Sequence, residues 1–277
     1  MDAVRLTAQQ RQFYADNGYL FLERVFAAAD VDVVRAALPA ALAEDSPRRV
    51  LERDGRTVRS VYGSHAHHEL FARLVRHPAL LGPARDLLGG DVHVYQFKIN
   101  AKAAFRGDVW EWHQDFIFWH HEDGLPAPQV ATFSVFLDDV TEFNGPLLLV
   151  PGSHRQGMID VRAGPTPEGY EDDPEWISNL TADLKYSLSQ ATLAGLVERH
   201  GMVAPKGPAG SVLVFDGNLA HGSNANMSPY DRAILLVTYN RTDNRPREVA
   251  RPRPEFLASR DPTPLRPLEG TRPALAG

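Results

Sequence analysis

The chain has 277 residues, of which 43% are hydrophobic and 23% charged, a composition that is ordinary for a soluble globular protein and predicts one domain spanning residues 1–277. Its formal net charge is −6, so it lacks the excess of basic residues that nucleic-acid-binding proteins usually show. It has no cysteine, no apolar run of about 18 residues and no basic-then-apolar leader, so we expect neither a disulfide, a membrane span nor a signal peptide, and we expect a cytoplasmic location.

The N-terminal third is mostly helical in pattern. Thr7-Ala-Gln-Gln10 is a capping box, in which the Thr7 hydroxyl and the Gln10 side chain satisfy free backbone amides at a helix start. That helix is expected to end near Asn17-Gly18, before a strand over residues 19–22. Apolar residues at three- and four-residue spacing predict two further helices, with a polar loop between them. The helices are expected over 28–44 and 67–89, and the loop over 45–64.

From residue 91 onward the pattern changes to short β-rich runs separated by Gly, Pro, Asn and Asp. The predicted strands lie within 92–99, 130–140, 147–150, 212–215 and 234–239. Many short strands with turn signals favour an all-β sandwich or barrel, preceded by packing helices. Residues 161–209 interrupt the series, with one helix expected over 180–200, and we interpret them as a lid insertion over one mouth of the barrel. The Pro- and Arg-rich segment from residue 245 is expected to be an extended tail.

The central motif is His113-Gln-Asp115, which has aromatic residues on both sides. In a strand, residues i and i+2 share a face, so the imidazole of His113 and the carboxylate of Asp115 would face one metal ion. Gln114 would then point the other way. His65-Ala-His67-His68 has the same spacing, but it lies at a loop-to-helix junction with no third ligand in pattern, and we favour a structural or solvated role for it.

A third candidate ligand, His221, follows the apolar run 212–215 and opens a turn rich in Gly and Asn. Two histidines and one carboxylate on one face of a metal leave positions open for a cosubstrate and O₂, as in the facial triad of non-haem Fe(II) oxygenases. Arg232 heads the next strand and can grip the distal carboxylate of 2-oxoglutarate through two parallel charge-assisted hydrogen bonds. Ser223 can donate to the same carboxylate.

With these residues the sequence resembles the phytanoyl-CoA dioxygenase family of Fe(II)/2-oxoglutarate oxygenases. The resemblance covers most of the chain, roughly residues 10–245, and is carried by His113-Gln-Asp115, His221-Gly-Ser223, Arg232, Asn144-Gly-Pro146 and Val150-Pro-Gly-Ser-His154. It implies a mainly β fold with flanking helices, the double-stranded β-helix or jelly roll, which is cupin-like. It also implies Fe(II), 2-oxoglutarate and O₂ as cofactor and cosubstrates. Four residues would lie around 2-oxoglutarate: Gln96, Asn100, Ser223 and Arg232.

Within that family, four stretches look most like bacterial enzymes that hydroxylate free L-proline at carbon 4, with ectoine hydroxylases more distant. These stretches are 54–59, 96–102, 112–119 and 238–243. The resemblance therefore implies trans-4-hydroxylation of L-proline, with succinate and CO₂ as coproducts. Pipecolate, another amino acid or ectoine are the alternatives. Asp115 occupies the position where halogenating relatives have a small residue, so the resemblance implies hydroxylation.

Arg59, Lys98 and Trp119 are candidate substrate contacts near the expected barrel mouth. Either cation would hold a substrate carboxylate, and the alternative for each is ordinary surface charge; the alternative for Trp119 is a core position. Two other classes of function stay open at this point: a Zn(II) hydrolase with the same three ligands, and a metal-binding jelly roll without catalysis. The hydrolase would leave Arg232 and Ser223 without a purpose. The expected partner is a small molecule rather than nucleic acid or membrane.

Overall fold

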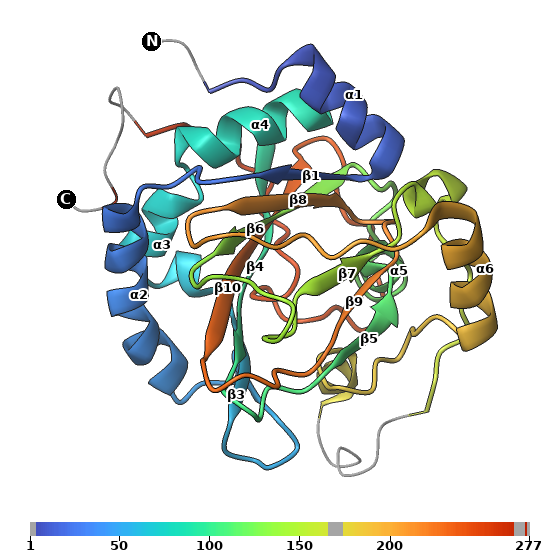
Figure 1. Ribbon diagram of the computed structural model, residues 1–277. Coiled ribbons are helices and arrows are strands. Elements are labelled where there is room, and N and C mark those ends of the chain that lie inside the picture. The colour runs from blue at the N-terminus through green and yellow to red at the C-terminus, as the bar shows by residue number, and fades with distance from the viewer. Residues whose placement is uncertain (1–3, 166–173, 269–274, 276–277) are drawn as a thin grey trace.

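Two antiparallel sheets that face each other form the body of the protein (Figure 1), in a computed structural model that describes residues 4–165, 174–268 and 275. The strands of the larger sheet are, in spatial order, β1(Tyr19–Leu22), β8(Val212–Asp216), β6(Val130–Phe136), β10(Arg232–Arg241), β4(Val92–Lys102), β3(Val58–Tyr62) and β2(Arg49–Leu51). The strands of the smaller sheet are β5(Trp110–His113), β9(His221–Ser223) and β7(Leu147–Leu149). From β4 to β10 the chain alternates between the two sheets, which confirms the predicted jelly roll.

Helices flank the sheets, as expected. They are α1(Ala8–Asn17), α2(Ala28–Ala43), α3(Glu69–Leu74), α4(Pro78–Leu88), α5(Asp115–Asp123) and α6(Gln190–His200), with short 3₁₀ turns η1(Ser64–Ala66), η2(Ser153–Gln156) and η3(Glu175–Asn179). The predicted capping box of Thr7 and Gln10 is present at the start of α1, and Gly18 ends that helix in a left-handed conformation. None of the helices in the described residues is long and apolar enough to cross a membrane.

Two of the predicted elements differ in the structure. The single helix expected over 67–89 is divided into α3 and α4, because Pro78 starts α4 and the preceding His77 is extended. The loop expected over 45–64 contains strands β2 and β3. That segment buries an ion pair between Arg59 and Glu52, with 2.9 Å between Nη1 and Oε2, beside the apolar residues Val61 and Tyr62. Hydrophobic periodicity cannot reveal such a pair.

The two faces of the larger sheet have different roles. On β4, Phe97 and Ile99 belong to the main hydrophobic core, which α2, α3 and α4 complete on the outside of the sheet. The alternate residues Gln96, Lys98 and Asn100 point to the other face, between the sheets, and are still less than 9% exposed. A polar face buried inside the barrel cannot contribute much hydrophobic stabilisation, so it marks the region in which to look for a site.

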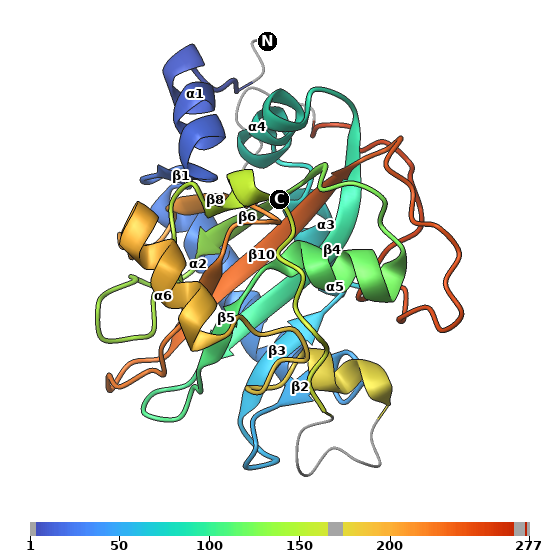
Figure 2. The same cartoon turned by 90° about the vertical axis from the view of Figure 1, so that its right-hand side faces the viewer.

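The insertion and the C-terminal tail lie against the same side of the molecule as α5 (Figure 2). The helix expected over 180–200 is shorter and begins at Gln190, because the Ser189 side chain caps it by accepting from the Thr192 amide. The tail is without regular secondary structure over its described residues. It is nevertheless anchored, because the buried Arg253 forms a two-bond ion pair with Asp123 of α5, at 2.6 and 2.8 Å.

Candidate metal centre

The three predicted ligands come together between the sheets. His113 ends β5, His221 begins β9, and the two are register partners in the smaller sheet. Asp115 lies beside both: its Oδ1 is 3.5 Å from Nε2 of His113, and its Oδ2 is 3.9 Å from Nε2 of His221. One nitrogen or oxygen of each residue falls within 4.8 Å of the others, and all three residues are buried. His65, His67 and His68 form no comparable group in the described part of the chain.

The backbone reaches this geometry by a different route from the one predicted. His113 and Asp115 do not share a strand face, because the strand ends at His113 and Asp115 is the first residue of α5. The Phe116 amide donates to the Gly217 carbonyl at 2.8 Å, which holds the first turn of α5 against the loop before His221. Gln114 does point away, as expected, since its carboxamide bonds to the backbone of Gly157 and Asn218.

Backbone carbonyls orient both imidazoles. Nδ1 of His113 lies 2.6 Å from the Glu111 carbonyl, and Nδ1 of His221 lies 2.9 Å from the Leu219 carbonyl. A carbonyl can only accept, so each Nδ1 carries the proton and each Nε2 keeps its lone pair for a metal. Burial, followed by the nearby His113, lowers the pKa of His221 to about 3, although Asp115 opposes this effect. The imidazole of His221 is therefore neutral, as a ligand must be.

The Asp115 carboxylate is also in the form that binds a metal. Burial alone would raise the pKa of Asp115, but the nearby groups, with the Lys98 cation first among them, outweigh burial and hold that pKa below its usual range. Its Oδ2 is buried without a hydrogen-bond partner in the described residues. Two imidazoles that direct Nε2 toward the site and one ionised, unsatisfied carboxylate fit a divalent first-row metal and match the donor set of Fe(II) oxygenases.

A first cavity beside the metal ligands contains three of the residues predicted for 2-oxoglutarate, namely Asn100, Ser223 and Arg232. Oδ1 of Asn100 is buried without a partner in the described chain. The guanidinium of Arg232 is 2% exposed, and burial lowers its pKa to about 10 while Asp138 acts in the opposite direction. A buried cation with free donors at the end of a cavity is suited to bind a carboxylate.

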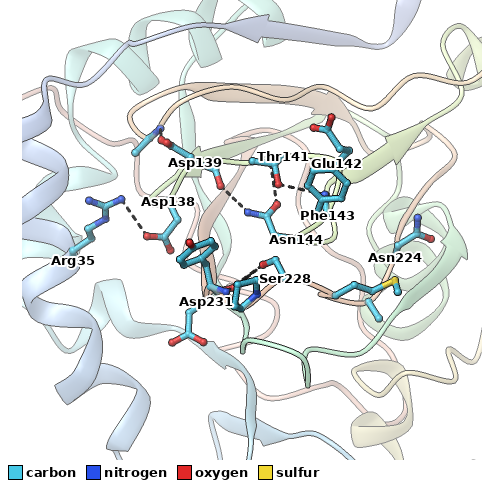
Figure 3. A pocket seen from close by; sticks show the side chains of 15 residues that line it. Arg35, Asp138, Asp139, Thr141, Glu142, Phe143, Asn144, Asn224, Ser228 and Asp231 are labelled. Carbon is cyan, nitrogen blue, oxygen red and sulfur yellow. Dashed lines mark hydrogen bonds and ion pairs between the residues drawn. The ribbon is translucent and has the colours of Figure 1, made fainter.

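The Asn144-Gly-Pro146 turn fixes the orientation of Arg232. Nε of Arg232 donates to the Asn144 carbonyl at 3.3 Å, and Nη2 donates to the Gly145 carbonyl. The Asn144 carboxamide is held in turn by the Thr141 amide and the Asp139 carbonyl (Figure 3). These residues form part of a wider groove of about 1150 Å³ on the outside of the barrel. Gly145 has φ +71°, and a Cβ there would lie 2.4 Å from the Asn224 carbonyl oxygen.

A second cavity adjoins the ligands on the side of α5. Lys98, Trp110 and His113 line both cavities, whereas Trp119 and Gln96 line only the second. Gln96, which the resemblance places around 2-oxoglutarate, lies in the cavity without Arg232, and its Nε2 donates to the Leu257 carbonyl at 2.7 Å. Trp119 and Lys98 are thus where a substrate contact is expected.

Arg59, the other cation predicted to contact the substrate, lines neither cavity. Its guanidinium pairs with Glu52 and stacks on the ring of Trp110, with Cζ 3.7 Å from the ring centroid. Its remaining donors bind backbone carbonyls of Leu180 and Thr181, in the insertion, and of Val109 before β5. Arg59 therefore connects the barrel to the insertion.

Asn179 and Arg253 line the second cavity but are not among the predicted site residues. Asn179 comes from the end of η3, and Arg253 comes from the tail. Neither belongs to a motif, and both reach the cavity through contacts between distant parts of the chain. Asn179 stands in the acidic loop region of the sequence, so only its burial in the fold distinguishes it from a solvated asparagine.

Comparison with known proteins agrees with this geometry. Residues 14–234 match the phytanoyl-CoA dioxygenase (PhyH) family. The chain is 43% identical to an L-proline trans-4-hydroxylase from Streptomyces griseoviridis, with 94% of this chain and 95% of that protein covered. It is 39% identical to an ectoine dioxygenase from Sphingopyxis alaskensis, with 97% and 90% covered.

A solved structure is similar over nearly the whole chain. EctD from S. alaskensis with 2-oxoglutarate and 5-hydroxyectoine is 35% identical, with a TM-score of 0.82, and 98% of this chain and 90% of that chain are covered. Another crystal structure of EctD contains bound Fe. The sequence match, the jelly roll and the His-Asp-His group agree with one another. The chain therefore belongs to the phytanoyl-CoA dioxygenase family of 2-oxoglutarate-dependent enzymes that use Fe(II).

Proposed function

We propose that this dioxygenase hydroxylates free L-proline at carbon 4 in the trans position. The observation that carries the proposal is the 43% identity, over nearly the full length of both chains, to an L-proline trans-4-hydroxylase. At the coarser level, the function is Fe(II)/2-oxoglutarate-dependent hydroxylation of a small amino acid or derivative. Pipecolate, the six-membered analogue of proline, is the next substrate to test.

His113, Asp115 and His221 would hold Fe(II), and the Arg232 cavity would hold 2-oxoglutarate. When bound, the iron and the cosubstrate supply O₂ activation, with succinate and CO₂ as coproducts of C–H hydroxylation. Arg232 and Ser223 would bind the distal carboxylate of 2-oxoglutarate, and the amide of Asn100 would lie along the same cavity. The protein would position the substrates and exclude water from the site, and it needs no separate acid or base residue.

The second cavity would take the amino acid. Trp119, Phe118 and Trp110 supply apolar walls that exclude water, while Lys98 and Gln96 supply polar contacts beside the ligands His113 and Asp115. A zwitterion must be held at its charged end so that one ring C–H faces the metal, because a misplacement of about 1 Å can cost on the order of a hundredfold in rate. The buried position of the cavity suits a small substrate.

The insertion would serve as a lid, as its sequence suggests. Asn179, Leu180 and Leu184 from this segment line the second cavity, so the described part of the insertion already closes one of its walls. The lid role and the single-domain organisation of residues 1–277 stay predictions, as does the cytoplasmic location.

Ectoine is the second candidate substrate. Its support is the 39% identity to an ectoine dioxygenase and the TM-score of 0.82 to EctD with 5-hydroxyectoine. Ectoine is also small and carries a carboxylate, so the same cavity chemistry applies to it. The Zn(II) hydrolase and the non-catalytic jelly roll are set aside, because the chain belongs to a family of 2-oxoglutarate-dependent dioxygenases.

A substrate panel tests the proposal. The protein, supplied with Fe(II), 2-oxoglutarate and O₂, would be given free amino acids including proline and pipecolate, then ectoine, then acyl-CoA thioesters. Succinate formation and product mass would be followed, and the position and stereochemistry of hydroxylation would be assigned by NMR. We expect trans-4-hydroxy-L-proline. Hydroxylation of ectoine or an acyl-CoA, with none of proline or pipecolate, would refute the substrate assignment while leaving the dioxygenase chemistry intact.

A further inference from the structure

We propose that Asn179 is a substrate-binding residue, whose carboxamide contacts both the amine and the carboxylate of the amino acid. This inference rests on the proposed function, since it assigns a partner within the second cavity. Asn179 is the last residue of η3, is 4% exposed, and lines the cavity that also contains Gln96 and Trp119.

The carboxamide of Asn179 is buried and unsatisfied. Both Nδ2 and Oδ1 are inaccessible to solvent and have no hydrogen-bond partner in the described residues. Buried side-chain amides in proteins are nearly always bonded, because an unpaired donor or acceptor loses its water without compensation. Gln96, the other carboxamide of this cavity, donates to a backbone carbonyl. Because neither Nδ2 nor Oδ1 of Asn179 has a partner, and the residue lines a cavity beside the metal ligands, we infer that a bound ligand supplies the missing hydrogen bonds.

The position of Asn179 is fixed by its neighbours in the chain. The carbonyl of Leu180 accepts from Nε of Arg59 at 3.0 Å, and that of Thr181 accepts from Nη2 at 3.2 Å. The Leu180 side chain is buried with Tyr62 in a small hydrophobic cluster. Arg59 is therefore a positioning residue, and it holds the segment that presents Asn179 to the cavity.

The chemistry of a carboxamide matches the α-amino acid group. Its N–H donors bind a carboxylate oxygen, and its carbonyl oxygen accepts from an ammonium, so one side chain can satisfy both ends of a zwitterion. Lys98, in the same cavity, provides the charge for the carboxylate. A neutral residue suits a zwitterion, because a second unpaired charge in a buried cavity would be costly in the free enzyme.

The test compares Asn179→Ala with the wild type on L-proline and on L-prolinamide, in which the carboxylate is replaced by a neutral amide. Losing hydrogen bonds to charged groups should raise the KM for L-proline by about tenfold to a hundredfold. The KM for 2-oxoglutarate should stay within about twofold. The preference for L-proline over L-prolinamide should shrink, a change that mere loosening of the insertion would not produce. Calorimetric titration of the anaerobic Fe(II)/2-oxoglutarate protein with L-proline would give the same loss as a binding constant.

Ser189→Ala is the matched control, since it removes the N-cap of α6 in the same insertion and lines neither cavity. It should lower the melting temperature without changing the KM for the amino acid. An unchanged KM and an unchanged substrate preference in Asn179→Ala would overturn the assignment of Asn179. A wild type that hydroxylates ectoine but not proline would overturn only the proline assignment, and the variant would then be compared on ectoine. A wild type inactive on every amino acid and on ectoine would overturn both proposals.

Discussion

Replacement of Arg232 should act selectively on the cosubstrate. A guanidinium has five N–H donors, of which Arg232 uses one for the Asn144 carbonyl and one for the Gly145 carbonyl. The remaining three face no other acceptor in the described residues and suffice for a bidentate contact with one carboxylate. Burial also lowers the pKa of Arg232 to about 10, although Asp138 acts in the opposite direction, so a bound carboxylate would stabilise the buried cation further.

The size of the effect follows from these contacts. Hydrogen bonds to charged groups contribute about 1.5–3 kcal/mol net, so Arg232→Ala should raise the KM for 2-oxoglutarate roughly tenfold to a hundredfold. Arg232→Lys keeps the charge but lacks the planar fork and the contacts to the turn, so it should recover only part of the loss. The KM for the amino acid should change little, because Arg232 does not line the second cavity.

Initial rates of succinate formation would be measured while 2-oxoglutarate is varied at saturating amino acid, and binding of 2-oxoglutarate would be followed by anaerobic calorimetry. Arg85→Ala is the control, because it removes an arginine that forms a partly exposed ion pair with Asp91 at 3.0 Å and lines neither cavity. An unchanged KM and binding constant for 2-oxoglutarate in Arg232→Ala would show that the arginine is structural.

Three further changes have defined outcomes. Asp115→Ala should abolish stoichiometric Fe(II) binding and turnover, and an active variant with a full metal content would disprove the ligand set. Gly145→Ala should raise the KM for 2-oxoglutarate and lower the melting temperature, because its Cβ would meet the Asn224 carbonyl; wild-type values would contradict this. Burial, followed by the nearby His67, lowers the pKa of His65 to about 4, whereas its pKa in the unfolded chain is near 6.5. The unfolded chain therefore binds the proton first, and the free energy of unfolding should decrease as pH falls from about 6.5 to about 4, by roughly 2–3 kcal/mol near pH 4.5. His65→Phe should flatten this dependence in calorimetric unfolding, and an equal slope in both proteins would refute it.

Local sequence signals predict the elements that depend on local physics. The capping box of Thr7 and Gln10 fixes the start of α1, and the alternation of apolar residues in β4 fixes which of its faces meets the helices. Strand β3 contains the buried Arg59, which pairs with Glu52, as well as the buried Val61 and Tyr62, and it pairs with β4. Pairing between charged residues leaves no hydrophobic period, so the sequence alone indicates a loop there.

Residue type and order predict the metal ligands, although the expected strand geometry of Asp115 is wrong. Asp115, in the first turn of the helix that follows the strand, still brings its carboxylate next to the two histidines. The separation of Gln96 from the Arg232 cavity has another cause. Alternation places Gln96, Lys98 and Asn100 on one face of β4, but each step of two residues advances about 7 Å along the strand. Asn100 consequently lies in the Arg232 cavity, Gln96 in the other, and Lys98 in both.

Arg59 and Lys98 show why charge and proximity do not determine a role. Both cations lie on strands of the larger sheet near the metal ligands, and both approach the ring of Trp110. Arg59 is occupied by Glu52 and by the carbonyl of Leu180, which is 121 residues away in the sequence, whereas Lys98 lines both cavities. A long-range partner thus converts one cation into a support for the insertion and leaves the other facing the site. The second cavity depends on this support, because the supported segment contributes Asn179 and Leu180 to its wall.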